Sequence, residues 1–179
     1  MSTPSPVYPR MSVADYLAFE HDQPVRHEFV DGYVYALTGA SEMHERISAN
    51  LLAALVVHLR GKPCRAYKGD LKIAVGEDHY YPDVFVTCGA DNPSGYVRTD
   101  PTVIIEVQSR STSRTDRGEK RLAYRRLPSL REYVLVWQDR TRVEVHGVDG
   151  DEVTVLEDGN DVLLLPSIEF GIGLADVYV

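Results

Sequence analysis

The chain has 179 residues, the length of one ordinary domain with its own hydrophobic core. Its formal net charge of −8 argues against a general polyanion-binding protein, because contacts to phosphates need a cationic surface. No apolar run approaches the roughly 20 residues of a membrane span, and residues 1–10 lack the regions of a secretory signal. We expect a loosely ordered Pro- and Ser-rich lead-in over residues 1–10 and one cytoplasmic domain over residues 11–179 that does not bind membranes.

The first elements have clear local signals. Ser12 with Asp15 resembles a helix N-cap, and apolar residues follow it at helical spacing. Residues 26–37 predict a β-hairpin, because two strand-like runs flank the turn-forming pair Asp31-Gly32. The chain should therefore begin with a short helix followed by a hairpin.

A longer helix is predicted from Ser41 to Gly61. Its apolar residues recur every fourth position and form a core-facing stripe of Met43, Ile47, Leu51, Leu55 and Leu59. His44 lies one position off this stripe, near the N-terminal end of the helix.

The rest of the chain is predicted to be mostly strands. One further helix, over about residues 112–127, should end before Pro128. Strands are expected over residues 64–75 (two strands, broken at 68–70), 80–88, 103–107, 132–137, 142–146, 153–157 and 161–165. Residues 89–100 predict a polar loop, and we expect an irregular C-terminal end. This order of elements predicts an α/β sandwich with a mixed central sheet flanked by helices.

The two cysteines, Cys64 and Cys88, form no CxxC motif, so the sequence does not indicate a zinc site. They could pair with each other. Without an export signal, however, we expect two reduced and buried thiols.

Two acidic residues lie among residues that predict buried strands. Asp83 precedes the run 84–86, and Glu106 lies near the end of the apolar run 103–107. A carboxylate in dry surroundings is costly unless it is paired, hydrogen-bonded or metal-bound. Glu106 and Gln108 project from the same face of a strand because they are two residues apart.

If the strands that carry Asp83 and Glu106 are neighbours, their side chains and that of Gln108 can converge. Two carboxylates and an amide oxygen make a hard oxygen site, which suits Mg²⁺ or Mn²⁺. Lys120 is a cation that could reach this site from the following helix.

These residues belong to a longer ordered pattern. It comprises Tyr81-Pro82-Asp83-Val84, Ile105-Glu106-Val107, Ser109, Ser111-Thr112, Asp116, Lys120, Tyr124 and the strand 132–136, preceded by His27-Glu28, Asp31-Gly32, His44 and Asn50. The pattern resembles the Uma2 family of restriction endonucleases, which is placed in the PD-(D/E)XK nuclease superfamily. The resemblance covers residues 12–145.

The resemblance implies a restriction-endonuclease-like fold and Mg²⁺-dependent hydrolysis of DNA phosphodiester bonds. Asp83, Glu106 and Gln108 would bind the metal, and Lys120 would act at the scissile phosphate. Gln108 stands where many relatives in the superfamily carry a lysine, so the helix lysine could take over that role. Arg110 stands where many Uma2 members carry proline. A homodimer is expected, because cutting both strands of a duplex needs two sites.

The resemblance also implies that Glu28 lies close to the metal site, as a further ligand or as a residue that holds a water molecule. It implies that the side chain of His44 faces the site. The alternatives are a surface charge on a hairpin for Glu28 and a structural role for a lone helix histidine. Asp116 and Lys120, four residues apart, could instead form an ordinary helix salt bridge.

The segment from Arg110 to Arg131 is the one basic stretch in an acidic chain. It could be a solvated helix face or a face that contacts phosphates.

Two other functions remain open. A catalytically inactive nuclease fold could act as a binding or regulatory module, as the acidic charge would suit, or the acids could serve structure alone, with Glu106 paired to Lys120 or to an arginine.

Overall fold

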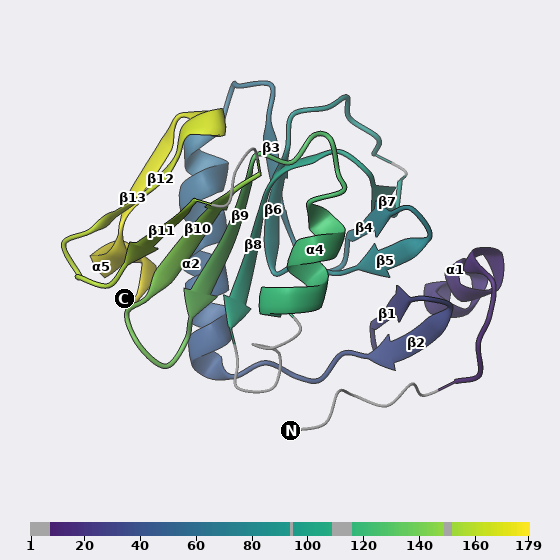
Figure 1. Cartoon of the computed structure of the whole chain (residues 1–179). Coiled ribbons are helices and arrows are strands. Elements are labelled where there is room, and N and C mark those ends of the chain that lie inside the picture. Colours follow the sequence, from purple (N-terminus) through teal and green to yellow (C-terminus); the bar gives the residue numbers. More distant parts are fainter. Residues whose placement is uncertain (1–7, 94, 109–115, 149–151) are drawn as a thin grey trace.

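A computed structural model describes residues 8–93, 95–108, 116–148 and 152–179. Most of the expected lead-in, residues 1–7, therefore lies outside the described residues. The described chain forms two main sheets with helices packed around them (Figure 1). No helix among the described residues is long and apolar enough to cross a membrane.

The larger sheet has six strands in the order β11-β10-β9-β8-β6-β3. Its strands are β3 (Arg65–Lys68), β6 (Val84–Thr87), β8 (Pro101–Gln108), β9 (Glu132–Trp137), β10 (Val143–Gly147) and β11 (Val153–Leu156). β8 and β9 are parallel, whereas the other neighbouring strands are antiparallel. The predicted α/β architecture with a mixed central sheet is confirmed.

Helices cover both faces of this sheet, which explains why its central strands are apolar throughout. On one face, α2 (Glu42–His58) packs the predicted stripe against β8 residues such as Ile105. On the other face, Ile104 packs with Tyr124 of α4 (Arg121–Tyr124). α2 and α4 lie on opposite sides of the sheet in Figure 1. α4 continues η1 (Asp116–Lys120), and the expected start of this helix lies outside the described residues.

The second sheet has five strands in the order β2-β1-β5-β4-β7. They are β1 (His27–Val30), β2 (Tyr33–Ala36), β4 (Lys72–Val75), β5 (Asp78–Tyr80) and β7 (Val97–Arg98). The predicted turn is confirmed: Asp31 and Gly32 have φ angles of 52° and 84° between β1 and β2. α1 (Val13–His21) covers this hairpin by stacking Tyr16 on Phe29, and Ser12 caps it as expected.

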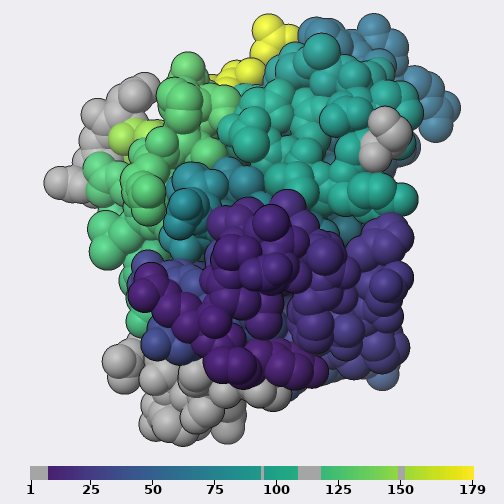
Figure 2. All heavy atoms as spheres, turned by 90° about the vertical axis from the view of Figure 1, so that its right-hand side faces the viewer, coloured from purple at the N-terminus to yellow at the C-terminus, as the bar shows by residue number. Residues whose placement is uncertain are grey.

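The N-terminal elements form a contiguous block beside the chain around β4 to β7 (purple against teal in Figure 2). The expected strand over residues 80–88 is in fact two strands, β5 and β6, which belong to different sheets. The chain passes between the sheets through Tyr81-Pro82-Asp83, where Pro82 has no N–H for a ladder.

The C-terminal end is ordered, so the expectation of an irregular end was wrong. β12 (Val162–Leu165) and β13 (Phe170–Gly173) form a hairpin around η2 (Pro166–Ile168), and α5 (Leu174–Val177) follows. Buried side chains of these elements join the core on the α2 side of the large sheet. β13 contains two glycines, so its sequence carries little of the apolar pattern of a strand.

The expectation of two reduced thiols was also wrong, because Cys64 and Cys88 form a disulfide. The antiparallel ladder of β3 and β6 places Arg65 opposite Thr87. One step further along this ladder, the two cysteines meet. Their pairing depends on the register of strands that are distant in sequence, which composition does not reveal.

The disulfide should stabilise the fold by closing a loop between residues with a sequence separation of 24. The double variant Cys64→Ala/Cys88→Ala should lose about 2–4 kcal/mol of unfolding free energy, because its unfolded chain has more freedom. Urea denaturation measures this loss, and reduced wild type serves as the control. Two titratable thiols in denatured, unreduced protein would contradict the pairing.

His79 should make stability depend on pH. Its ring packs against Tyr16 and Phe29, and burial lowers its pKa below 6.5, although a bond to the Glu77 carbonyl opposes this shift. Stability present above pH 6.5 should therefore fall as the pH drops from 6.5 toward the lower folded-state pKa. Urea denaturation across this pH range should show that the free energy of unfolding falls less steeply with decreasing pH for His79→Gln than for wild type. Equal pH dependence of the two proteins would contradict the role of His79.

Candidate active site

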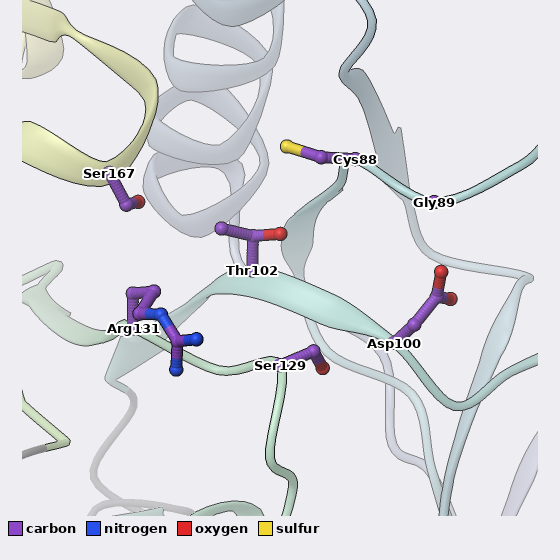
Figure 3. A pocket seen from close by; sticks show the side chains of 7 residues that line it. All are labelled: Cys88, Gly89, Asp100, Thr102, Ser129, Arg131 and Ser167. Atoms are coloured by element: carbon purple, nitrogen blue, oxygen red, sulfur yellow. The ribbon is translucent and has the colours of Figure 1, made fainter.

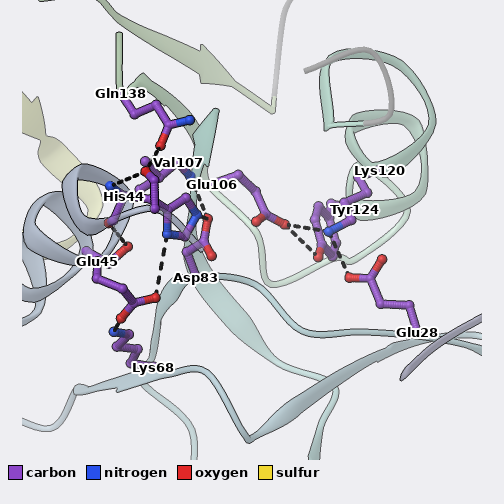
Figure 4. A network of polar contacts seen from close by, with 12 residues as sticks. Glu28, His44, Glu45, Lys68, Asp83, Glu106, Val107, Lys120, Tyr124 and Gln138 are labelled. Atoms are coloured by element: carbon purple, nitrogen blue, oxygen red, sulfur yellow. Dashed lines mark hydrogen bonds and ion pairs between the residues drawn. The ribbon is translucent and has the colours of Figure 1, made fainter. Parts of the chain in front are cut away.

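Asp83 and Glu106 are brought together by the pairing of β6 with β8. Val84 lies opposite Ile105 in this antiparallel ladder, so the next position along places Asp83 opposite Glu106. The carboxylate of Asp83 also accepts the main-chain N–H of Val107 through Oδ2, at 2.7 Å. The acid is thus fixed to the β8 backbone immediately after Glu106, as Figure 4 shows.

Glu106 is buried on the α4 face of β8, with 3% of the residue exposed. Its Oε1 accepts a hydrogen bond from the Tyr124 hydroxyl at 3.2 Å and lies 3.4 Å from Lys120 Nζ. Burial raises the pKa of Tyr124 well above its usual value, and the charge of Glu106 raises it further. The phenol therefore stays protonated and donates to the acid.

Lys120 ends η1 and is shared by two carboxylates. Its Nζ lies 2.7 Å from Oε1 of Glu28 and 3.4 Å from Oε1 of Glu106. The same oxygen of Glu28 accepts the main-chain N–H of Tyr81 at 3.1 Å. Glu28 is 8% exposed, so it is not the surface charge that the hairpin pattern alone would favour.

His44 approaches Asp83 from the first turn of α2, where Ser41 caps the helix by accepting the His44 N–H. Its Nε2 lies 3.2 Å from Oδ2 of Asp83, and its Nδ1 lies 3.7 Å from Glu45. Burial is the largest influence and lowers the pKa of His44. The hydrogen bond and charge of Asp83, together with Glu45, outweigh it, so the net shift is upward. The cationic imidazole is favoured beside the acid.

Gln108 is the last residue of β8 and is 2% exposed. It lies on the same face of the strand as Glu106, two positions further along, and is opposite Trp137 of β9. Hydrogen bonds and ion pairs thus form two groups, Glu28–Lys120–Glu106 and His44–Asp83, which meet where Asp83 accepts the Val107 N–H. Strand geometry places Gln108 beside Glu106. The side chains of Asp116 and Arg110, whose roles the sequence predicted, lie outside the described residues.

Two further tyrosines belong to this network and were not among the predicted site residues. Tyr124 lies one helical turn beyond Lys120, so the spacing could have pointed to it. Tyr81 acts through its main-chain N–H, which no side-chain pattern reveals.

Two cavities lined by described residues lie away from these acids. The larger, of about 560 Å³, is lined by Cys88, Gly89, Asp100, Thr102, Ser129, Arg131 and Ser167 (Figure 3). It lies at the start of β8, whereas Glu106 and Gln108 lie at its end. The other, of about 400 Å³, borders the end of α2 and β3.

The acid site has more negative than positive charge. Glu28, Asp83 and Glu106 face Lys120 and a histidine. Within the described ranges, no three His, Cys, Asp or Glu side chains form a group that could hold a metal ion by themselves. A divalent ion would therefore depend on two carboxylates together with main-chain, amide, solvent or substrate oxygens.

The fold and the site define a mixed α/β protein with paired acids where two central strands meet. Residues 13–176 match the family Uma2, described as "Putative restriction endonuclease". The match covers most of the chain, so the chain belongs to the Uma2 family.

Two relatives come from Synechocystis sp. (strain ATCC 27184 / PCC 6803 / Kazusa). "Uncharacterized protein slr1290" is 35% identical over 181 residues, covering 98% of this chain and 95% of that protein. "Uncharacterized protein sll1609" is 33% identical over 153 residues, covering 82% of this chain and 85% of that protein.

A crystal structure at 1.96 Å resolution from Anabaena variabilis ATCC 29413 has a similar fold, with a TM-score of 0.80. It is described as "a putative nuclease belonging to DUF820", is 16% identical, and the likeness covers 94% of this chain and 97% of that one. At this identity the likeness shows a shared fold alone.

Lys120 should be needed for stability because it lies between two buried carboxylates. Replacing it as Lys120→Met leaves both acids facing each other without the ammonium, and should cost about 3–5 kcal/mol of unfolding free energy. Urea denaturation at neutral pH measures the loss. Lys68→Met, which breaks a pair with half-exposed Glu45, should cost about 1 kcal/mol or less. Equal effects of the two variants would contradict the burial argument.

Proposed function

We propose that this protein is a Mg²⁺- or Mn²⁺-dependent endodeoxyribonuclease that hydrolyses phosphodiester bonds in DNA. The observation that carries the proposal is the meeting of Asp83 and Glu106 across β6 and β8, with Lys120 beside Glu106. Membership of the Uma2 family supports the same reaction class. Homodimerisation is part of the proposal, since cleavage of both strands of a duplex needs two such sites.

The donor set fits a small, hard cation. The site holds carboxylate oxygens in excess over its cations, and Mg²⁺ is usually bound by one or two carboxylates while it keeps several waters. The Asp83 side chain is 23% exposed, so an ion and its waters can reach it. Asp83 and Glu106 would hold the ion, with Gln108 and a main-chain carbonyl supplying neutral oxygens.

When bound, the ion would lower the pKa of an attacking water and stabilise charge on the phosphate. The chain's own groups have separate tasks. Tyr124 and the Val107 N–H orient the two acids, and His44 holds Asp83 through its Nε2. Lys120, held by Glu28, would offset the negative charge that develops at the scissile phosphate.

A purely structural role for the acids, as in an inactive binding or regulatory module, is the competing explanation, because both acids take part in ion pairs. The distances from Lys120 to the two acids favour a metal-binding role for Glu106 over a purely structural one. Lys120 lies closer to Glu28, at 2.7 Å, than to Glu106, at 3.4 Å, so the charge of Glu28 alone can balance that of the ammonium. A second buried carboxylate then adds a desolvation cost that buried ion pairs rarely recover as stability.

Replacing either acid by its amide should weaken metal binding and slow cleavage together. Asp83→Asn and Glu106→Gln should each weaken Mg²⁺ binding, measured by calorimetry. Each should also slow plasmid cleavage by about 100-fold or more, because losing even an outer-shell partner of a metal ligand costs about 10–100-fold. Asp70→Asn, in the exposed pair with Arg26, is the matched acid-to-amide control and should behave as wild type. Circular dichroism should show all three variants folded.

A wild type that binds no Mg²⁺ or Mn²⁺ at millimolar concentration, with DNA present, would sink the proposal. So would full cleavage by either acid-to-amide variant. In either case the structural explanation of the acids would take its place.

A further inference from the structure

A second buried polar cluster lies beside the proposed site and centres on Glu20, the penultimate residue of α1. Glu20 is 0% exposed. Its Oε1 accepts the His27 N–H at 3.0 Å and the Tyr81 hydroxyl at 2.8 Å, and its Oε2 lies 3.0 Å from His27 Nδ1. A fully buried carboxylate is costly, and this one is satisfied by groups from β1 and from the segment that follows β5.

Tyr81 links this cluster to the acid site. Its hydroxyl donates to Glu20 and accepts from Lys72 Nζ at 3.1 Å. Its main-chain N–H donates to Glu28 at 3.1 Å, and Asp83 follows two residues later, after Pro82. Anchoring the Tyr81 ring therefore fixes a short segment that contacts one site acid and carries another.

Glu28 is held from its other side through His27, the residue before it. Both the main chain and the imidazole of His27 bond to Glu20. The His27 carbonyl also accepts the Tyr16 hydroxyl at 2.7 Å. Glu20 thus fixes both the strand that carries Glu28 and the tyrosine whose N–H binds it.

Apolar packing already joins α1 to β1, since Tyr16 stacks on Phe29. Buried polar groups of this kind are often replaceable by apolar residues without loss of stability, so stability alone does not account for them. We propose that Glu20 and Tyr81 are positioning residues, which fix Glu28 and Asp83 relative to each other in the nuclease site. This inference rests on the proposed function.

The test is Tyr81→Phe, which removes the hydroxyl and keeps the ring, the main-chain N–H and Pro82. The matched control is Tyr178→Phe, which removes a hydroxyl that also makes two hydrogen bonds, both to the main chain of Arg142. Plasmid cleavage should be measured over a range of Mg²⁺ concentrations, well below the melting temperature of each protein. Tyr81→Phe should lower kcat and raise the half-saturating Mg²⁺ concentration by about tenfold or more, while the control changes neither.

The two readouts separate positioning from stability. A smaller folded fraction lowers the rate equally at every Mg²⁺ concentration, whereas a displaced site changes the Mg²⁺ dependence. A lower rate at unchanged Mg²⁺ dependence would therefore overturn the inference, as would identical behaviour of Tyr81→Phe and Tyr178→Phe. If wild type neither binds Mg²⁺ nor cleaves DNA, the proposed function fails and the positioning role fails with it. If wild type is active and Tyr81→Phe behaves as wild type does, the positioning role alone is contradicted and the proposed function stands.

Discussion

The pairing of β6 with β8 is the constraint on which the acid site depends. Its register places Asp83 opposite Glu106, and the Val107 N–H holds Asp83 there. A slip of one residue would turn Glu106 into the apolar layer under α2, because strand side chains alternate between faces. Both faces of β8 are buried, and each face has its own apolar partners, so this register is strongly specified. Packing of the core therefore fixes the acids.

The cost of burying the acids is met by groups that are distant in sequence. Lys120 and Tyr124 come from the helix after β8, and the N–H that holds Glu28 comes from the chain between the two sheets. Each contact satisfies a carboxylate and also docks one element on another. The same interactions that make the site possible thus join the N-terminal hairpin, the large sheet and α4.

The parts of this arrangement that the sequence predicted are the local ones. Ser12, Ser41 and Asp31-Gly32 signal a cap or a turn through their own chemistry, and each proved correct. The spacing of Glu106 and Gln108 was enough to place both on one face of β8. The disulfide and β13 were missed because each depends on register or packing against distant residues, and the glycines of β13 carry no apolar pattern.

Glu28 shows why burial is the hardest property to read from a sequence. The residue pattern of its hairpin suits an exposed acid, yet Glu28 is buried and bonds to Lys120 and to the Tyr81 N–H. Lys120 can pair with both Glu28 and Glu106 only when the β1–β2 hairpin packs beside the helix formed by η1 and α4. The charge balance of the site therefore depends on tertiary docking: without the hairpin, Lys120 would face Glu106 alone, and the excess of negative charge that suits a divalent cation would be smaller.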